Sequence, residues 1–590
     1  MLLRSKGKNF RISGNCVFFD RITGHFCCKR KTLLIEDGII RSVLPYEEAG
    51  SHVLDEHCVI FPGLSDLHSH VDYNMIQVWD SMKETKGVPW DNRHEWRKSI
   101  KYREEISGVH KLIDKEWKDV IIRKEGEDIL LGDIMLYFCE LQAVCGGTTV
   151  LQENGCTKNR LGSLESDMDD DEPEFRYSFS GDVKMFPSYS FMEDEEDDAV
   201  LRANVAENHV KYLVLRSTGV AKDLGFPDGK EISSIVDLYR PGESGPQNMN
   251  PETYLPHRKT GEWQITDALY RDKLTDFIAS KDKRQNGFLI HLAEGRAGNL
   301  FGGSDPEWKE WDQYSRNEFL EFKNYILDCE KEGLFTEQDV IDTHINFIHG
   351  CGIDLSNEED RDFMKKHGIG MIWSPVSNLL LYGDTPKTYD YLWEDGVLTG
   401  IGSDWSPSGS KHAWDECKFA RKFMKKHAAD KTNIEEKILK AVTVNASEML
   451  GCEKIGNIQE GAFADLFVLR SEKKIEENIS EAFSAFFESS DQNVELVMLG
   501  GNAVYGEEAC ISGLIDERER EWLVQLESKE EALAGKRLLL SEYFRKADFR
   551  EIYGAYVSKL EEAGIPISLI RSEEDAEYRR AITDLTDKYA

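Results

Sequence analysis

Two histidines, His68 and His70, stand two residues apart at the end of a short run that follows the turn residues Pro62-Gly63. Residues two apart in a β-strand project to the same face, so both imidazoles are expected to point into one site. Two converging neutral imidazoles can bind a divalent ion through nitrogen at roughly 2.0–2.1 Å. A lone His-x-His pair is weak evidence, and it becomes informative only with further ligands in comparable places.

His291 closes the apolar run that begins at Phe288, and Glu294 follows three residues later. As the chain turns out of a strand, this spacing can return the carboxylate to the side of a metal-activated water. Glu294 could then transfer protons while His291 serves as a ligand. The alternative is a polar histidine at a strand end followed by an exposed glutamate at the start of a helix.

Two later strand ends carry the same kinds of side chain. His349 closes Asn346-Phe-Ile-His, where it could be a further ligand or a neutral group that polarises the reacting centre. Asp404 closes Gly400-Ile-Gly-Ser-Asp, where a carboxylate can complete a metal shell and accept a proton from water. An aspartate in this position is also a common helix N-cap.

The ordered set is stronger evidence than any single member, because each residue follows a short apolar run. It predicts His68, His70, His291 and Asp404 as ligands of one divalent ion, with Glu294 and His349 as the groups that move protons and polarise the substrate. We therefore expect a hydrolase that attacks an sp² carbon with a metal-activated water, Asp404 orienting and deprotonating that water.

Positioning these residues requires a series of parallel strands whose C-terminal ends meet. Strand-like apolar runs alternate with helix-like stretches from residue 62 to about 450. This alternation predicts an α/β fold, a (β/α)8 TIM-like barrel with its site at the C-terminal strand ends. Long segments around 80–130, 157–180 and 220–265 exceed ordinary connections and are expected to be loop insertions over the barrel.

Short strand-like runs precede and follow the predicted barrel, and the last segment is charged and helix-patterned. The expected domains are the N-terminal part of a small β-sandwich, the barrel with its insertions, the C-terminal part of the sandwich and a helical extension. Their boundaries are 1–61, 62–445, 446–508 and 509–590.

Over residues 14–506 the sequence resembles the amidohydrolase superfamily. The front anchor is Phe61-Pro-Gly-Leu-Ser-Asp-Leu-His-Ser-His, and the rear anchor is Thr443-Val-Asn-Ala-Ser-Glu-Met-Leu-Gly with the segment from Ile455 to Leu466. In that family the strands before and after the barrel form one small discontinuous domain. His291-Leu-Ala-Glu294, His349-Gly350 and Ser374-Pro-Val-Ser-Asn378 are most similar to the cytosine and guanine deaminases and the chlorotriazine hydrolases.

This resemblance implies one divalent metal ion, commonly zinc or iron, at the four positions named above. It gives Glu294 the proton-shuttle role and His349 the substrate-polarising role, and it places Ser374 and Asn378 beside the substrate. Trp405 is expected to form a wall of the pocket. Two-metal relatives use a carboxylated lysine, for which Lys184 is the one candidate noted, so a second ion stays open.

The bulk composition limits the partners. The formal net charge of −36 repels phosphate backbones and anionic lipid, so we expect neither nucleic acid nor a membrane as a partner, and a small molecule as the substrate. No signal-peptide pattern or apolar run of about 20 residues occurs, and the cysteines are scattered, so a soluble cytoplasmic protein with reduced thiols is predicted. A homo-oligomer is compatible with the sequence.

These residues are compatible with three functions. The first is a deaminase-like aminohydrolase acting on a C–N bond of a small heterocycle. The second is an amidase, cyclic-imidase or peptidase of the same superfamily with one or two metals. The third is a non-catalytic binding protein on the same scaffold, which is disfavoured because all six proposed ligand and proton-handling positions are present.

Overall fold

The structure of the protein is a computed structural model that describes most of the chain outside one long central segment. The described residues are 9–70, 73–79, 81, 85, 89–97, 99–112, 117, 120–123, 129–152, 184–186, 275, 278–279, 288–298, 312–526, 535–540, 544–545, 548–566 and 570–590. The insertions expected at 157–180 and 220–265 lie outside these residues.

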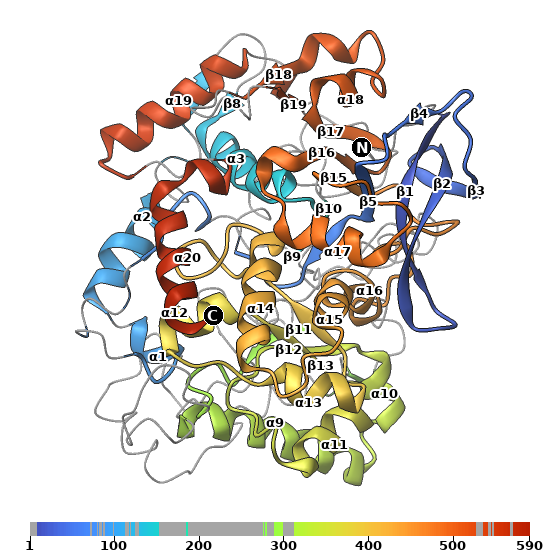
Figure 1. The fold of residues 1–590 in the computed structure, drawn as a ribbon. Coiled ribbons are helices and arrows are strands. Elements are labelled where there is room, and N and C mark those ends of the chain that lie inside the picture. The colour runs from blue at the N-terminus through green and yellow to red at the C-terminus, as the bar shows by residue number, and fades with distance from the viewer. Residues whose placement is uncertain are drawn as a thin grey trace, which may run out of the picture.

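A ten-stranded sheet joins the first strands of the chain to strands that follow residue 465 (Figure 1). Its order is β18-β19-β17-β16-β15-β5-β1-β2-β3, with β4 paired to β1. The strands are β1 (Asn9–Asp20), β2 (His25–Glu36), β3 (Ile39–Pro45), β4 (His52–Val53), β5 (Cys58–Pro62), β15 (Leu466–Arg470), β16 (Val494–Leu499), β17 (Asn502–Glu507), β18 (Leu523–Gln525) and β19 (Lys536–Leu539).

The antiparallel pair β5–β15 is the junction between the two halves of this sheet, with Ile60 opposite Val468. Side chains of a strand alternate between its faces. Accordingly, Val59 and Phe61 enter the large core shared with the helices, whereas Ile60 and Val468 enter a separate core on the other face. Burial on both faces explains why these strands read as continuous apolar runs.

Two smaller sheets, both fully parallel, make up the α/β part of the molecule. One has the order β10-β9-β6 and the other the order β11-β12-β13-β14. Their bounds are β6 (Leu64–Asp66), β9 (Thr148–Gln152), β10 (Lys184–Phe186), β11 (Phe288–Leu292), β12 (Ile345–His349), β13 (Gly370–Trp373) and β14 (Thr399–Ile401). A parallel bridge between Ser69 and Asp404 connects the end of β6 to the end of β14.

Helices alternate with the strands of the second parallel sheet, which confirms the α/β class predicted from the sequence. They are α9 (Gln313–Glu332), α10 (Glu337–Asp342), α11 (Glu358–Lys366), α12 (Pro375–Tyr382), α13 (Thr388–Asp395), α14 (Ala413–His427), α15 (Ile434–Ala441) and α16 (Val444–Met449). Local sequence sets their ends: Asp312 caps α9 by accepting a hydrogen bond from the Ser315 amide, and Gly333 ends that helix in the left-handed conformation.

The segment between β6 and β9 contains short elements rich in aromatic residues. They are α1 (Arg93–Trp96), the π-helix η2 (Tyr102–Ser107), α2 (Gly108–Lys111), β7 (Ile121–Arg123), β8 (Ile129–Leu130) and α3 (Leu131–Cys145). Trp79 and Trp96 are almost completely buried in the large core. This predicted insertion is therefore packed into the molecule through its tryptophans.

The C-terminal segment was expected to be a helical extension, but it also contains β18 and β19. Leu538 and Leu539 of β19 are buried on opposite faces, so this strand extends the large sheet from β17. The remaining elements from residue 479 are α17 (Ile479–Glu488), η8 (Asp491–Asn493), α18 (Glu508–Ser512), η9 (Glu519–Trp522), α19 (Phe549–Glu562), η12 (Ser572–Glu574) and α20 (Ala576–Tyr589).

Helix α20 returns to the α/β part and packs against α12 and α14 (Figure 1). At its start Asp575 forms an ion pair with Lys411, whose amino nitrogen lies 3.1 Å from the carboxylate oxygen, and both side chains are buried. Burial lowers the pKa of Lys411, and the charge of Asp575 opposes that shift. Lys411 belongs to the loop that follows β14, so α20 supports that loop directly.

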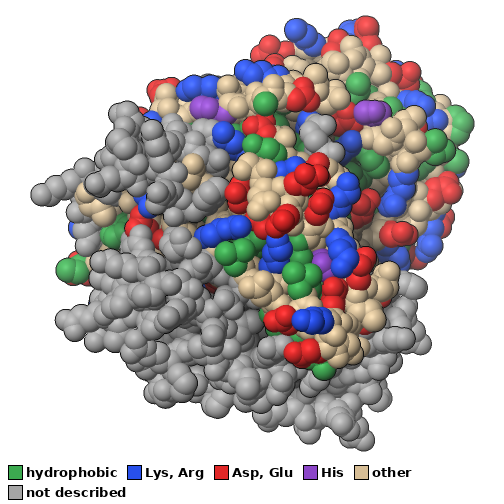
Figure 2. Space-filling model, turned by 90° about the horizontal axis from the view of Figure 1, so that it is seen from below, with side chains coloured by type: hydrophobic (Ala, Val, Ile, Leu, Met, Phe, Trp, Pro, Cys, Tyr) green, Lys and Arg blue, Asp and Glu red, His purple; other side chains and the backbone are tan. Residues whose placement is uncertain are grey.

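On the face shown in Figure 2, basic and acidic side chains are interspersed over the described part of the surface. Among all the described residues, no helix is both long and apolar enough to cross a membrane.

The Lys411–Asp575 pair generates a stability prediction. Replacing Asp575 with Asn leaves a buried ammonium without its counter-charge, so the free energy of unfolding should fall by about 3–5 kcal/mol, as measured in urea. The matched control is Glu47→Gln, which breaks the exposed Arg11–Glu47 pair and should change the same quantity by less than about 1 kcal/mol. Equal losses in the two variants would contradict this account of the pair.

Candidate metal centre and active site

The site forms where the backbone after β6 meets the backbone after β14. The amide of Asp404 donates to the carbonyl of His68 at 2.7 Å, and the amide of His70 donates to the carbonyl of Asp404 at 2.9 Å. These two hydrogen bonds flank the bridge at Ser69 and fix the register between the segments. His68 and His70 thus lie just beyond β6 rather than inside a strand, although the spacing argument predicted a strand.

Gly402 permits this close approach. A Cβ at residue 402 would lie 2.4 Å from the Cβ of His68 and 2.7 Å from its backbone nitrogen. Real side chains cannot approach so closely, so any other residue would push the two segments apart. This close contact explains why residue 402, in the strand-end run Gly400-Ile-Gly-Ser-Asp, is a glycine.

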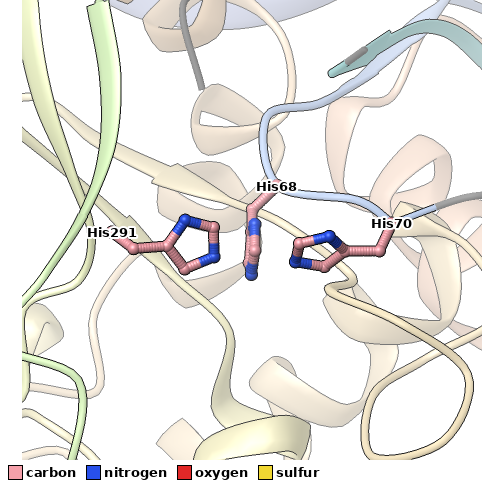
Figure 3. Close-up of side chains that lie close together, drawn as sticks. All are labelled: His68, His70 and His291. Carbon is pink, nitrogen blue, oxygen red and sulfur yellow. The ribbon is translucent and has the colours of Figure 1, made fainter. Parts of the chain in front are cut away.

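The predicted ligands converge as the sequence analysis proposed. The imidazoles of His68, His70 and His291 point toward one another (Figure 3), and the ring centroids of His68 and His291 are 4.7 Å apart. One carboxylate oxygen of Asp404 lies 3.1 Å from Nε2 of His68 and 3.5 Å from Nε2 of His70. Ligand atoms of His68, His70 and His291 lie within 4.8 Å of one another, a geometry able to hold a metal ion.

Electrostatics prepare these side chains for a cation. Burial, followed by repulsion from the neighbouring imidazoles, holds the pKa of His291 well below its ordinary value, so the ring is neutral at physiological pH. Burial alone would raise the pKa of Asp404, but the combined attraction of His68, His70 and His349 outweighs it and keeps that pKa below its usual range. A neutral His291 and an ionised Asp404 are the forms in which these side chains can bind a divalent transition metal.

The backbone at three strand ends adopts the left-handed conformation that non-glycine residues rarely use. The φ angles are 56° at Ala293, 67° at His349 and 61° at Asp404. Each such residue costs free energy that the surrounding fold must supply, and such positions cluster at active sites. Here the unusual angles occur where the chain leaves β11, β12 and β14.

Glu294 and His349, which the sequence predicts to move protons and polarise the substrate, lie beside the candidate metal ligands. Nε2 of His349 is 3.8 Å from Oε2 of Glu294 and 4.0 Å from Oδ2 of Asp404. Burial lowers the pKa of His349, against the opposing attraction of Glu294. All three side chains are buried, so proton movement among them is shielded from bulk water.

Asn378 is predicted to lie beside the substrate. In the structure it contacts Nδ1 of His349, the ring nitrogen on the side away from Glu294 and Asp404. Its Oδ1 is 2.9 Å from Nδ1 of His349, and its Nδ2 donates to Oγ1 of Thr385 at 3.1 Å. Trp373 donates to the same Thr385 oxygen at 2.7 Å. Because Thr385 takes the amide N–H of Asn378, the amide oxygen accepts a hydrogen bond from Nδ1–H of His349. In neutral His349, Nε2 then carries the lone pair that faces Glu294 and Asp404.

The other two predicted substrate contacts, Ser374 and Trp405, are both buried. Ser374 is fully buried at the start of α12. The Trp405 ring centroid lies 6.2 Å from that of His70 and 5.1 Å from that of Tyr73. For Lys184 only the backbone is described, as part of β10, so its proposed link to a second metal stays untested.

Sequence reasoning missed several residues that surround Glu294. Tyr382 donates a 2.6 Å hydrogen bond to Oε1 of Glu294. Arg93 donates to Glu318 at 3.0 Å, and Glu318 accepts the amide of Ala293, the residue whose left-handed backbone turns Glu294 into the site. Tyr382 is four residues beyond Asn378 and could have been found from helical spacing, whereas nothing near Arg93 signals its role.

Comparison with known proteins supports the family that the sequence motifs predict. Residues 261–504 match the model of the amidohydrolase family. Among curated proteins, a 5-methylthioadenosine/S-adenosylhomocysteine deaminase of Halothermothrix orenii is 28% identical over 152 residues, which cover 25% of this chain and 35% of the relative. The protein of the same name from Thermococcus onnurineus is 31% identical over 159 residues, covering 26% of this chain and 36% of the relative.

Among solved structures, guanine deaminase from C. acetobutylicum with bound guanine aligns with 84% of this chain and 100% of its own. That alignment has a TM-score of 0.46 and 14% sequence identity. The matches to the first curated relatives cover little more than a third of those relatives' length.

In this chain the region that matches the amidohydrolase family model, residues 261–504, supplies His291, Glu294, His349 and Asp404. The curated relatives that it matches in sequence are deaminases. The family predicted from the motifs is thereby confirmed.

The contact at Gly402 generates a prediction about the metal centre. Gly402→Ala should separate the segments after β6 and β14, because the new methyl group would meet the backbone of His68. We expect bound metal per chain to fall at least about tenfold, a loss typical when the geometry around a metal ligand is disturbed.

The matched control is Gly554→Ala in the interior of α19, where a Cβ meets nothing within 4 Å. This variant should keep its metal and gain about 0.5–1 kcal/mol of stability from the better helix former. Metal retained equally by both variants would show that the close approach at Gly402 is unnecessary.

Proposed function

We propose that the protein is a metal-dependent aminohydrolase that replaces an exocyclic amino group of a small heterocycle with oxygen from water, releasing ammonia. The observation that carries this proposal is that the imidazoles of His68, His70 and His291 lie together, with Asp404 against His68 and His70 and with the buried Glu294 and His349 beside them. The deaminase names of the matched relatives support the choice of bond.

His68, His70, His291 and Asp404 would hold the metal, for which zinc is our first choice and iron the second. A bound divalent ion lowers the pKa of a water ligand toward about 7 and so supplies a nucleophile at neutral pH. The donor set of neutral nitrogens and one carboxylate fits this group. We propose one ion, since Glu294 supplies the proton transfer that a second centre would otherwise assist.

Three side chains of the protein would then transfer protons and stabilise charge during the reaction. Asp404 orients the attacking water and accepts its first proton. His349 would stabilise negative charge on the ring atom next to the attacked carbon once its Nε2 carries a proton, while its Nδ1–H stays bonded to Asn378. Glu294 would pass the proton lost by the water to the departing amino group, so the C–N bond breaks with loss of ammonia while the carbon keeps the new oxygen and the product keeps the second water proton.

We further propose that the two parallel sheets are arcs of one eight-stranded barrel. The bridge between Ser69 and Asp404 joins the arcs on one side, and all seven described strands are parallel. In this view the ten-stranded sheet is the second, discontinuous domain, with boundaries near residues 62 and 446, and the C-terminal segment is its continuation. We also propose that the substrate is a free small molecule and that the enzyme acts in the cytoplasm.

The proposed ligands can be separated from the proposed proton shuttle. His291→Ala and Asp404→Ala should each lose both bound metal and ammonia release. Glu294→Gln should keep the metal and lose about 10²- to 10⁴-fold in rate, the usual contribution of a general acid–base group. Metal analysis and an ammonia assay over aminoheterocycles and adenosine derivatives check these outcomes, with N-acyl compounds assayed for amine release.

The matched control is His57→Ala, because His57 lies outside the site and hydrogen-bonds to the backbone of Ser471. That variant should keep both metal and activity. Full turnover by Asp404→Ala would refute the assignment, and amine release without ammonia release would point to amide hydrolysis instead.

A further inference from the structure

A chain of two hydrogen bonds leads from the segment before β7 to the carboxylate of Glu294. The indole nitrogen of Trp96 lies 2.8 Å from the hydroxyl oxygen of Tyr382, and that oxygen lies 2.6 Å from Oε1 of Glu294. The three side chains are 8%, 1% and 5% exposed. Hydrogen bonds to charged groups in such an environment are strong, because water does not compete for them.

The direction of both hydrogen bonds is determined by chemistry. An indole N–H can only donate, so the Tyr382 oxygen accepts from Trp96. The single hydroxyl proton of Tyr382 is then left to point at Glu294. Burial and the nearby charge of Glu294 hold the pKa of Tyr382 well above its ordinary value, which keeps this proton on the hydroxyl.

The two oxygens of Glu294 are therefore not equivalent. Oε1 accepts the Tyr382 hydrogen bond, whereas Oε2 faces the site, 3.8 Å from Nε2 of His349 and 3.9 Å from Nη1 of Arg93. A proton placed on Oε1 would compete with the Tyr382 hydroxyl for the same oxygen. A proton placed on Oε2 meets no such competition from Tyr382 and lies on the side of His349.

We propose that Tyr382 is a positioning residue that fixes the Glu294 carboxylate and reserves Oε2 as the atom that carries the transferred proton. This inference rests on the proton-shuttle role proposed for Glu294. Tyr382 acts through Glu294 and does not itself transfer a proton to the substrate.

Helix α12 gives this role a structural basis. Asn378 and Tyr382 are one helical turn apart, so they lie on the same face of the helix. Asn378 holds His349 and Tyr382 holds Glu294, so one helix face orients both proposed proton-handling residues. Trp96, which orients the Tyr382 hydroxyl, comes from a segment outside the matched family region of residues 261–504.

The test compares Tyr382→Phe with Tyr389→Phe in the metal-loaded, full-length protein. Tyr389 is equally buried, but its hydroxyl has no hydrogen-bond partner among the described residues. We expect Tyr382→Phe to lower kcat between about 10- and 100-fold, the loss that follows from one hydrogen bond to a charged group, with KM and metal content within about twofold of wild type. Tyr389→Phe should keep kcat within about twofold.

A second measurement does not depend on turnover. The urea midpoints of Tyr382→Phe, Glu294→Gln and the double variant form a thermodynamic cycle, and the double variant should lose less than the sum of the single losses. If no heterocycle releases ammonia with the wild-type protein, the proposed function fails while this cycle still decides the contact. Additive losses, or a kcat for Tyr382→Phe equal to that of Tyr389→Phe, would overturn the inference.

Discussion

The site depends on a short stretch of parallel backbone pairing between the segments that follow β6 and β14. Two hydrogen bonds around Ser69 fix the position of His68 and His70 relative to Asp404, although Asp404 follows them by more than 330 positions in the chain. Gly402 is the steric condition for this pairing. The geometry of the candidate metal site therefore depends first on this backbone register and then on the side chains that the register brings together.

The site residues share a second constraint, the conformation of the chain where strands end. Ala293, His349 and Asp404 all have positive φ angles, and each is stabilised by neighbouring interactions. Glu318 accepts the amide of Ala293, and the amide of Asp404 is bound by the carbonyl of His68. Buried polar contacts thus hold two of these turns, and the turns place the candidate site residues.

The convergence of the candidate metal ligands could be predicted because each of them follows a short apolar run, and parallel strands bring such ends together. His68, His291 and Asp404 illustrate this rule. The residues around Glu294 could not be predicted in the same way. Arg93 and Trp96 lie in a segment that the sequence predicts only as a loop insertion, and their placement depends on tertiary packing. Tyr382 was within reach, because helical spacing from Asn378 places it on the same face.

The segments outside the predicted barrel were harder to interpret. Charged, helix-patterned sequence after residue 508 concealed β18 and β19, since a strand of three or four residues has too little periodicity to distinguish it from a helix end. The buried pair of Lys411 and Asp575 has a consequence for synthesis of the chain. This ion pair, which ties the loop after Asp404 to the start of α20, forms only after the ribosome has extended the chain beyond residue 575, when all six proposed ligand and proton-handling residues have already been synthesised.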